Sequence, residues 1–93
     1  MTKKPKQTIH IAWRSFGDQT VILDLEKGRL FHEFNGPGSL IWRLSDGNHS
    51  IEDIAHEVMS EYEVSAEQAQ TDTEEFLSAL DQRGLITWDK ESS

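Results

Sequence analysis

Apolar residues change their spacing part-way along this chain. In the first third they alternate with polar residues or form short β-branched runs, a pattern typical of strands. This pattern predicts three strands, at Ile9–Arg14, Gln19–Leu25 and Arg29–Phe34. Glu26-Lys27-Gly28 is a tight hairpin turn in which Gly28 takes the left-handed backbone conformation. We expect these strands to form one small antiparallel sheet.

Beyond the strands the apolar residues recur at helical spacing. Pro37 suits the first turn of a helix. Ser50 and Ser65 are predicted to cap a second and a third helix, and Gly84 follows the third as a C′ glycine. A short closing strand is predicted at 85–88. The order predicts an α+β fold of the winged helix-turn-helix type, with a three-stranded antiparallel sheet followed by three helices.

The length of 93 residues allows one small domain, expected at 8–88. Residues 1–7 are basic and lack a following apolar segment, so we expect a flexible tail rather than a signal peptide. A short C-terminal tail is expected at 89–93. There is no cysteine, and no apolar run approaches the roughly 18 residues of a membrane span. A cytoplasmic protein without a membrane partner is predicted.

The net charge of −8 is unevenly distributed. Asp46 to Gln82 contains eleven acids and no Lys or Arg, whereas residues 1–45 contain four acids and seven bases. A winged helix usually inserts its third helix into DNA, where cations contact phosphates. The third helix predicted here carries five acids: Glu67, Asp72, Glu74, Glu75 and Asp81. We therefore expect no nucleic-acid partner.

No pattern of side chains indicates catalysis. The four histidines show neither the His-x3-His nor the HExxH spacing that places two imidazoles on one helix face. Asp72, Glu74 and Glu75 point in different directions on a helix, with no nucleophile nearby in the sequence. The prediction is a protein that is not an enzyme, with no catalytic residues, no metal site and no cofactor.

A longer set of residues resembles the PqqD family, the small proteins of pyrroloquinoline quinone synthesis and the related recognition domains for ribosomal precursor peptides. The resemblance covers about residues 19–88. It rests on the order and spacing of Asn35, Gly38, Ile41-Trp42, Leu44, Asp46-Gly47, Ser50, Ile54-Ala55, Asp72, Phe76-Leu77, Leu80 and Gly84-Leu85-Ile86.

The resemblance implies a mechanism of strand addition. In the family, the leader segment of a precursor peptide lies as an extra strand against the third strand and fills the groove beside the third helix. The implied peptide-binding residues of the strand are Arg29, Leu30, Phe31, His32, Glu33 and Phe34. Those of the helix are Asp72, Glu75, Phe76 and Ala79. The implied partners are the leader of a ribosomal precursor peptide and a leader protease or other modifying enzyme.

Two departures from the family pattern refine this hypothesis. Quinone-synthesis members carry a Tyr-Pro-Glu-Gly turn where this chain has Leu25-Glu26-Lys27-Gly28, so the chain looks more similar to stand-alone leader-binding proteins of lasso-peptide clusters. The segment 28–35 is a residue longer than usual, which predicts a bulge or a shifted alternation. The alternatives are a peptide chaperone of quinone synthesis, a winged-helix DNA-binding regulator, and an adaptor subunit of a larger enzyme.

Overall fold

The computed structural model describes residues 3–8, 11–25, 28 and 31–90, with the backbone alone for Phe31, Asp89 and Lys90. The elements, in chain order, are β1 (Lys3–Gln7), β2 (Ile11–Phe16), β3 (Gln19–Asp24), β4 (Phe31–Asn35), α1 (Pro37–Leu44), α2 (Ile51–Tyr62), α3 (Ala66–Gln82) and β5 (Ile86–Lys90). Strands β2, β3 and β4 form an antiparallel sheet that precedes the three helices. The predicted α+β winged helix-turn-helix fold is therefore confirmed.

The sheet has the strand order β2-β3-β4. The ladder between β3 and β4 runs from Leu23↔Phe31 to Gln19↔Asn35 in continuous register. Within residues 31–35 there is thus no bulge, contrary to the expectation for that part of the segment. The first strand of this sheet, β2, ends at Phe16, two residues later than predicted. Ile9 and His10, where the predicted strand begins, lie outside the described residues.

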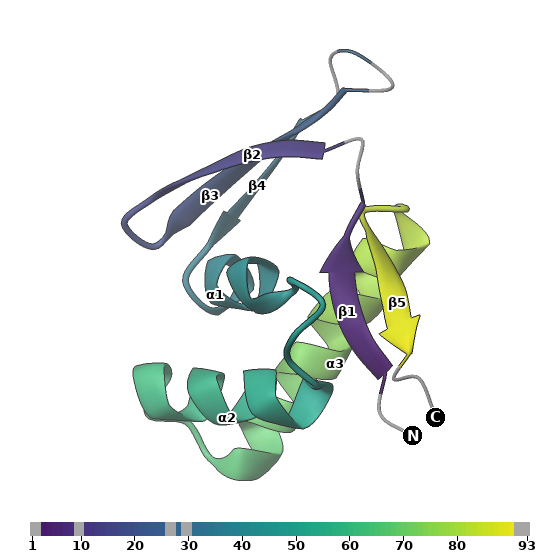
Figure 1. Cartoon of the computed structure of the whole chain (residues 1–93). Coiled ribbons are helices and arrows are strands. Elements are labelled where there is room, and N and C mark those ends of the chain that lie inside the picture. The colour runs from purple at the N-terminus through teal and green to yellow at the C-terminus, as the bar shows by residue number, and fades with distance from the viewer. Residues whose placement is uncertain (1–2, 9–10, 26–27, 29–30, 91–93) are drawn as a thin grey trace.

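A second, two-stranded sheet joins the two ends of the chain. Strand β1 pairs antiparallel with β5, from Lys3↔Lys90 to Gln7↔Ile86 (Figure 1). The expectation of a flexible tail at 1–7 was thus wrong for residues 3–7, and residues 89–90 belong to β5 rather than to a tail. The cause is long-range: Pro5 is buried, and its carbonyl accepts a hydrogen bond from the Gly47 amide at 2.8 Å.

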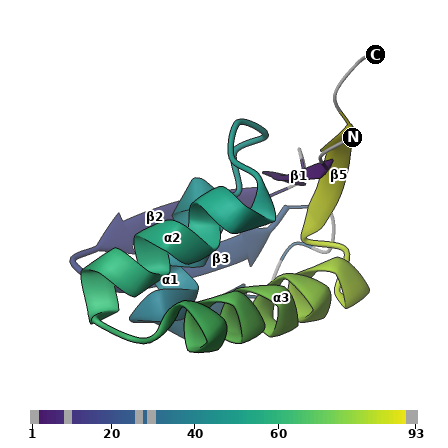
Figure 2. The same ribbon diagram turned by 90° about the horizontal axis from the view of Figure 1, so that it is seen from below.

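The helices pack as a second layer beside the sheet. Figure 1 shows α1 between the β2–β3–β4 sheet and α2, and Figure 2 shows α2 and α3 side by side. The core between these elements contains Ile22, Leu40, Ile41, Trp42, Ile54, Ala55, Val58, Ala69, Leu77, Leu80, Leu85 and Ile86. Trp42 is fully buried, whereas Trp13 on β2 is 37% exposed and meets the Trp42 ring edge-on.

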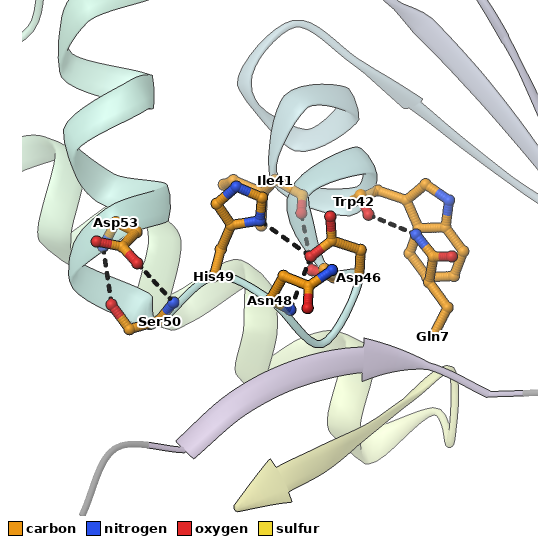
Figure 3. Close-up of polar contacts among 9 residues, drawn as sticks. Gln7, Ile41, Trp42, Asp46, Asn48, His49, Ser50 and Asp53 are labelled. Atoms are coloured by element: carbon orange, nitrogen blue, oxygen red, sulfur yellow. Dashed lines mark hydrogen bonds and ion pairs between the residues drawn. The ribbon is translucent and has the colours of Figure 1, made fainter. Parts of the chain in front are cut away.

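Local hydrogen bonds fix where the helices begin. The Ser50 hydroxyl accepts from the Asp53 amide, and the Asp53 carboxylate accepts from the Ser50 amide, both at 3.1 Å (Figure 3). This capping box confirms the predicted start of α2. Ser65 caps α3 by accepting from the Gln68 amide at 3.1 Å. Both caps are encoded locally, which is why the sequence pattern found them.

Candidate functional site

Strand β4 is an edge of the main sheet. Its neighbour β3 occupies one side, and no described strand pairs with the other side. An exposed edge offers a row of backbone N–H and C=O groups to any additional strand. The register places His32 and Phe34 opposite Ile22 and Thr20, which are buried, so these two side chains project toward the helical layer. Glu33 lies on the opposite face of the sheet and is exposed.

One face of α3 borders this strand. Asp72, Phe76, Ala79 and Arg83 are spaced at i, i+4, i+7 and i+11, so they follow one side of the helix. This side lies next to the buried stripe formed by Ala69, Thr73, Leu77 and Leu80. Asp72 and Phe76 are half-buried, whereas Ala79 and Arg83 are exposed.

Two side-chain contacts connect β4 with α3. The rings of Phe34 and Phe76 meet edge-to-face, with centroids 4.9 Å apart. Two turns further along α3, an Arg83 Nη1 lies 3.1 Å from His32 Nδ1. Ala79 lies between Phe76 and Arg83 along the helix, and its methyl group fills little space. These five residues, together with Asp72 and Glu75 on the same helix, define the surface that we call the β4–α3 groove.

The electrostatics of the groove follow from these contacts. Burial, and secondly the Arg83 guanidinium, lower the pKa of His32 below 6.5, although Asp24 opposes the shift. Because a guanidinium can only donate, His32 Nδ1 accepts the hydrogen bond and the imidazole is neutral. At the other end, Asp72 Oδ1 accepts from Gln68 Nε2 at 2.8 Å.

The structure brings together part of the predicted site. His32, Phe34 and Phe76 are joined through the contacts described above, and Asp72 and Ala79 share the same face of α3. Glu75 is exposed one position before Phe76, at the margin of that face. Arg29 and Leu30 lie outside the described residues, and the side chain of Phe31 is not described.

Sequence reasoning missed Arg83. It follows the last residue of α3 as the C-cap. Its position four residues after Ala79 continues the same helical face, and this spacing is the signal that could have revealed it. Its partner His32 is 51 residues away in the chain, and no local pattern predicts that contact.

A comparison with models of protein families shows to which family the chain belongs. The family model of coenzyme PQQ synthesis protein D (PqqD) matches residues 19–86. The chain belongs to the PqqD family. The match contains β3, β4 and all three helices, so it spans the whole β4–α3 groove.

Solved structures of PqqD-like fold support this placement. One is TbiB1 in complex with the TbiA(beta) leader peptide, with 25% identity, a TM-score of 0.78, and coverage of 95% of this chain and 99% of that one. Another is a lasso peptide synthetase B1 complexed with the leader peptide, also with 25% identity and a TM-score of 0.78, covering 90% and 98%. No curated protein matches the chain.

Among the described residues, no group of three or more His, Cys, Asp or Glu side chains is arranged to hold a metal ion. In the same part of the chain, no helix combines the length and apolar character needed to cross a bilayer.

Proposed function

We propose that this protein is a non-catalytic leader-peptide-binding protein of lasso-peptide or related peptide biosynthesis. It captures the leader of a ribosomal precursor peptide by β-strand addition at β4. It then presents the remainder of the precursor to a separate leader protease or other modifying enzyme in the cytoplasm. The observation that carries the proposal is the β4 edge beside α3 in a chain whose two structural relatives are complexes with leader peptides.

Strand addition suits the chemistry of this edge. Backbone hydrogen bonds from β4 supply affinity that tolerates many sequences, while alternate side chains of the peptide reach the groove and supply specificity. Phe34 and Phe76 form its apolar floor, and the small Ala79 leaves space for a peptide side chain. A leader that is disordered when free loses conformational entropy on binding, so we expect moderate affinity.

A lasso-type pathway is favoured over quinone synthesis. The family match alone does not separate these pathways, but one similar solved structure is a lasso peptide synthetase B1 complexed with the leader peptide. DNA binding is disfavoured because α3 carries five acids and no cation within its bounds. The partner enzyme could contact the acidic helical half; charge reversal at Glu61, Glu63 and Glu67 that leaves delivery unchanged would argue against that contact.

The decisive experiment is a titration with a synthetic leader taken from the nearest short open reading frame, followed by backbone amide NMR. Saturable shifts concentrated at residues 31–35 and 72–83 are expected. The variant Ala79→Arg fills the groove and should abolish them. Ser78→Arg is its matched control, because Ser78 is exposed on a different side of α3. A folded protein that binds no neighbouring leader would contradict the proposal.

A further inference from the structure

The β4–α3 groove has charges of opposite sign at its two ends. Asp72 and Glu75 lie in the middle part of α3, before Phe76, and Arg83 is the C-cap residue of the helix. Between them, the face offers Phe76 and Ala79, which carry no charge. A peptide lying along the groove therefore meets a negative end, an apolar centre and a positive end.

The Arg83 guanidinium lies beside β4. It donates to His32 on β4 at 3.1 Å, which holds the positive charge beside the strand that an added peptide would pair with. One donor is used in this bond, and a guanidinium has five, so others remain for a carboxylate. The chain has no Lys or Arg from Asp46 to Gln82, so no other cation of the helical half before Arg83 can take this role.

The acidic end is also defined by contacts. Asp72 is half-buried, and Gln68 orients its carboxylate through the hydrogen bond at 2.8 Å. Its second oxygen, together with the exposed carboxylate of Glu75, can accept from a cationic side chain. Neither carboxylate is paired with a Lys or Arg in any contact recorded for the described residues.

The spacing of the charges translates into a spacing along a peptide. Arg83 follows Glu75 by eight positions and Asp72 by eleven, which at a rise of about 1.5 Å per residue is roughly 12 to 17 Å. A strand advances about 3.4 Å per residue, so this distance corresponds to roughly four to five residues. Side chains on one strand face recur at every second residue, which leaves a spacing of four.

The direction follows from the order of contacts. His32 precedes Phe34 on β4, whereas its partner Arg83 follows Phe76 on α3, so strand and helix run in opposite directions along the groove. The sheet is antiparallel throughout, and antiparallel pairing is the more stable per residue. A peptide antiparallel to β4 starts near Asp72 and ends near Arg83.

We propose that this groove selects extended peptides in which a basic residue is followed, about four positions later, by an acidic residue, with an apolar side chain between them. The basic residue pairs with Asp72 and Glu75, and the acidic residue pairs with Arg83. The two charge pairs fix both the direction and the register of the bound strand. This inference rests on the proposed function, because it specifies the ligand of the same groove.

The test uses a display library of random peptides selected against the wild-type protein and against two variants. Arg83→Glu reverses the charge beside His32. Arg14→Glu makes the same change on the outer face of the sheet, at an exposed residue of β2. The wild-type protein and Arg14→Glu should enrich the basic-then-acidic pattern, and Arg83→Glu should prefer a basic residue at the formerly acidic position.

A selected peptide then measures how strongly the charge pair with Arg83 contributes to binding. Replacing its acidic residue by Lys should weaken binding to the wild-type protein by roughly tenfold, and Arg83→Glu should restore the loss. The difference should shrink as salt is added. If Arg83→Glu does not fold, the peptide substitution on the wild-type protein, together with Arg83→Gln, measures the same interaction.

The outcomes separate the two proposals. Peptides that shift the β4 amides but show no ordered charge pattern would overturn this inference and leave leader capture intact. The reverse order, acidic before basic, would overturn it as well. If neither the library nor the neighbouring leader yields a peptide that binds at β4, both proposals fail.

Discussion

Phe76 lies directly against Gly38. A Cβ built on Gly38 would stand 2.9 Å from Cε1 and 3.1 Å from Cζ of the Phe76 ring. Gly38 has no positive φ, so close approach rather than backbone conformation explains the glycine. Absence of a side chain at the start of α1 allows the ring to meet Phe34 and form the floor of the β4–α3 groove.

Gly38→Ala should therefore displace the Phe76 ring. Alanine in a helix interior ordinarily stabilises relative to glycine by up to about 1 kcal/mol, but here the overpacking should reverse the sign and cost about 1–3 kcal/mol. Urea unfolding of the variant and the wild-type protein measures the difference in their free energies of unfolding. In a Phe76→Ala background the penalty should vanish, and an undiminished penalty there would show that the ring is not its cause.

Thr73 and Thr20 provide a matched pair of buried threonines. Thr73 Oγ1 has no hydrogen-bond partner among the described residues, whereas the Thr20 hydroxyl bonds with the Ser39 hydroxyl. Thr73→Val should be neutral or stabilise the fold by up to about 1 kcal/mol, because it removes an unsatisfied polar group. Thr20→Val should destabilise it by about 1–2 kcal/mol. Urea midpoints distinguish them, and equal effects would contradict the assignment.

The Ser50 cap links stability to pH through Asp53. Backbone and then side-chain hydrogen bonds with Ser50 hold the pKa of Asp53 below 3.8. A lowered carboxyl pKa contributes stability to the folded state above pH 3.8, and that contribution is lost as the pH falls through the folded-state pKa. Ser50→Ala should raise the Asp53 pKa in a carbon-detected NMR titration, and Ser65→Ala should leave it unchanged.

Ser50→Ala should also destabilise the protein at neutral pH by about 1 kcal/mol. The change removes the hydroxyl that accepts from the Asp53 amide. Thermal unfolding at neutral pH checks the size of the effect. An unchanged midpoint would mean that solvent replaces the cap without cost.

The His32–Arg83 contact predicts a titration with a defined sign. Burial is the larger cause of the lowered His32 pKa and Arg83 the second. Arg83→Gln should therefore raise that pKa part of the way toward 6.5 but not beyond, as measured by the imidazole NMR signals. As the pH falls, His32 takes up its proton at a higher pH in the unfolded chain than in the folded protein. The contribution of the neutral imidazole to stability is therefore present above pH 6.5 and is lost as the pH falls through the folded-state pKa.

Strand β1 makes the first residues structural. Deleting residues 1–7 should destabilise the fold, because it removes buried Pro5, the partner strand of β5 and the hydrogen bond from Gln7 Nε2 to the Trp42 carbonyl at 2.8 Å (Figure 3). Deleting only 1–2 is the control. If both truncated proteins were equally stable, residues 3–7 would not contribute to the stability of the fold.

Much of the architecture follows from local sequence. The caps at Ser50 and Ser65, proline at the first turn of α1, and the glycine after α3 each act through residues within a few positions, so their patterns are visible in the chain. The buried stripe of α3 follows from its period. Family membership likewise rests on order and spacing that the sequence displays.

Tertiary structure alone decided the pairings between distant segments. In the sequence, β1 resembles a lysine-rich tail. It forms a strand because it pairs with β5, near the other end of the chain, and no local pattern shows that pairing. The placement of Arg83 beside His32 depends on how α3 packs against β4, and no short-range pattern encodes it. Local propensity and periodicity determine which elements form, while burial and backbone pairing between remote segments determine which side chains share a site.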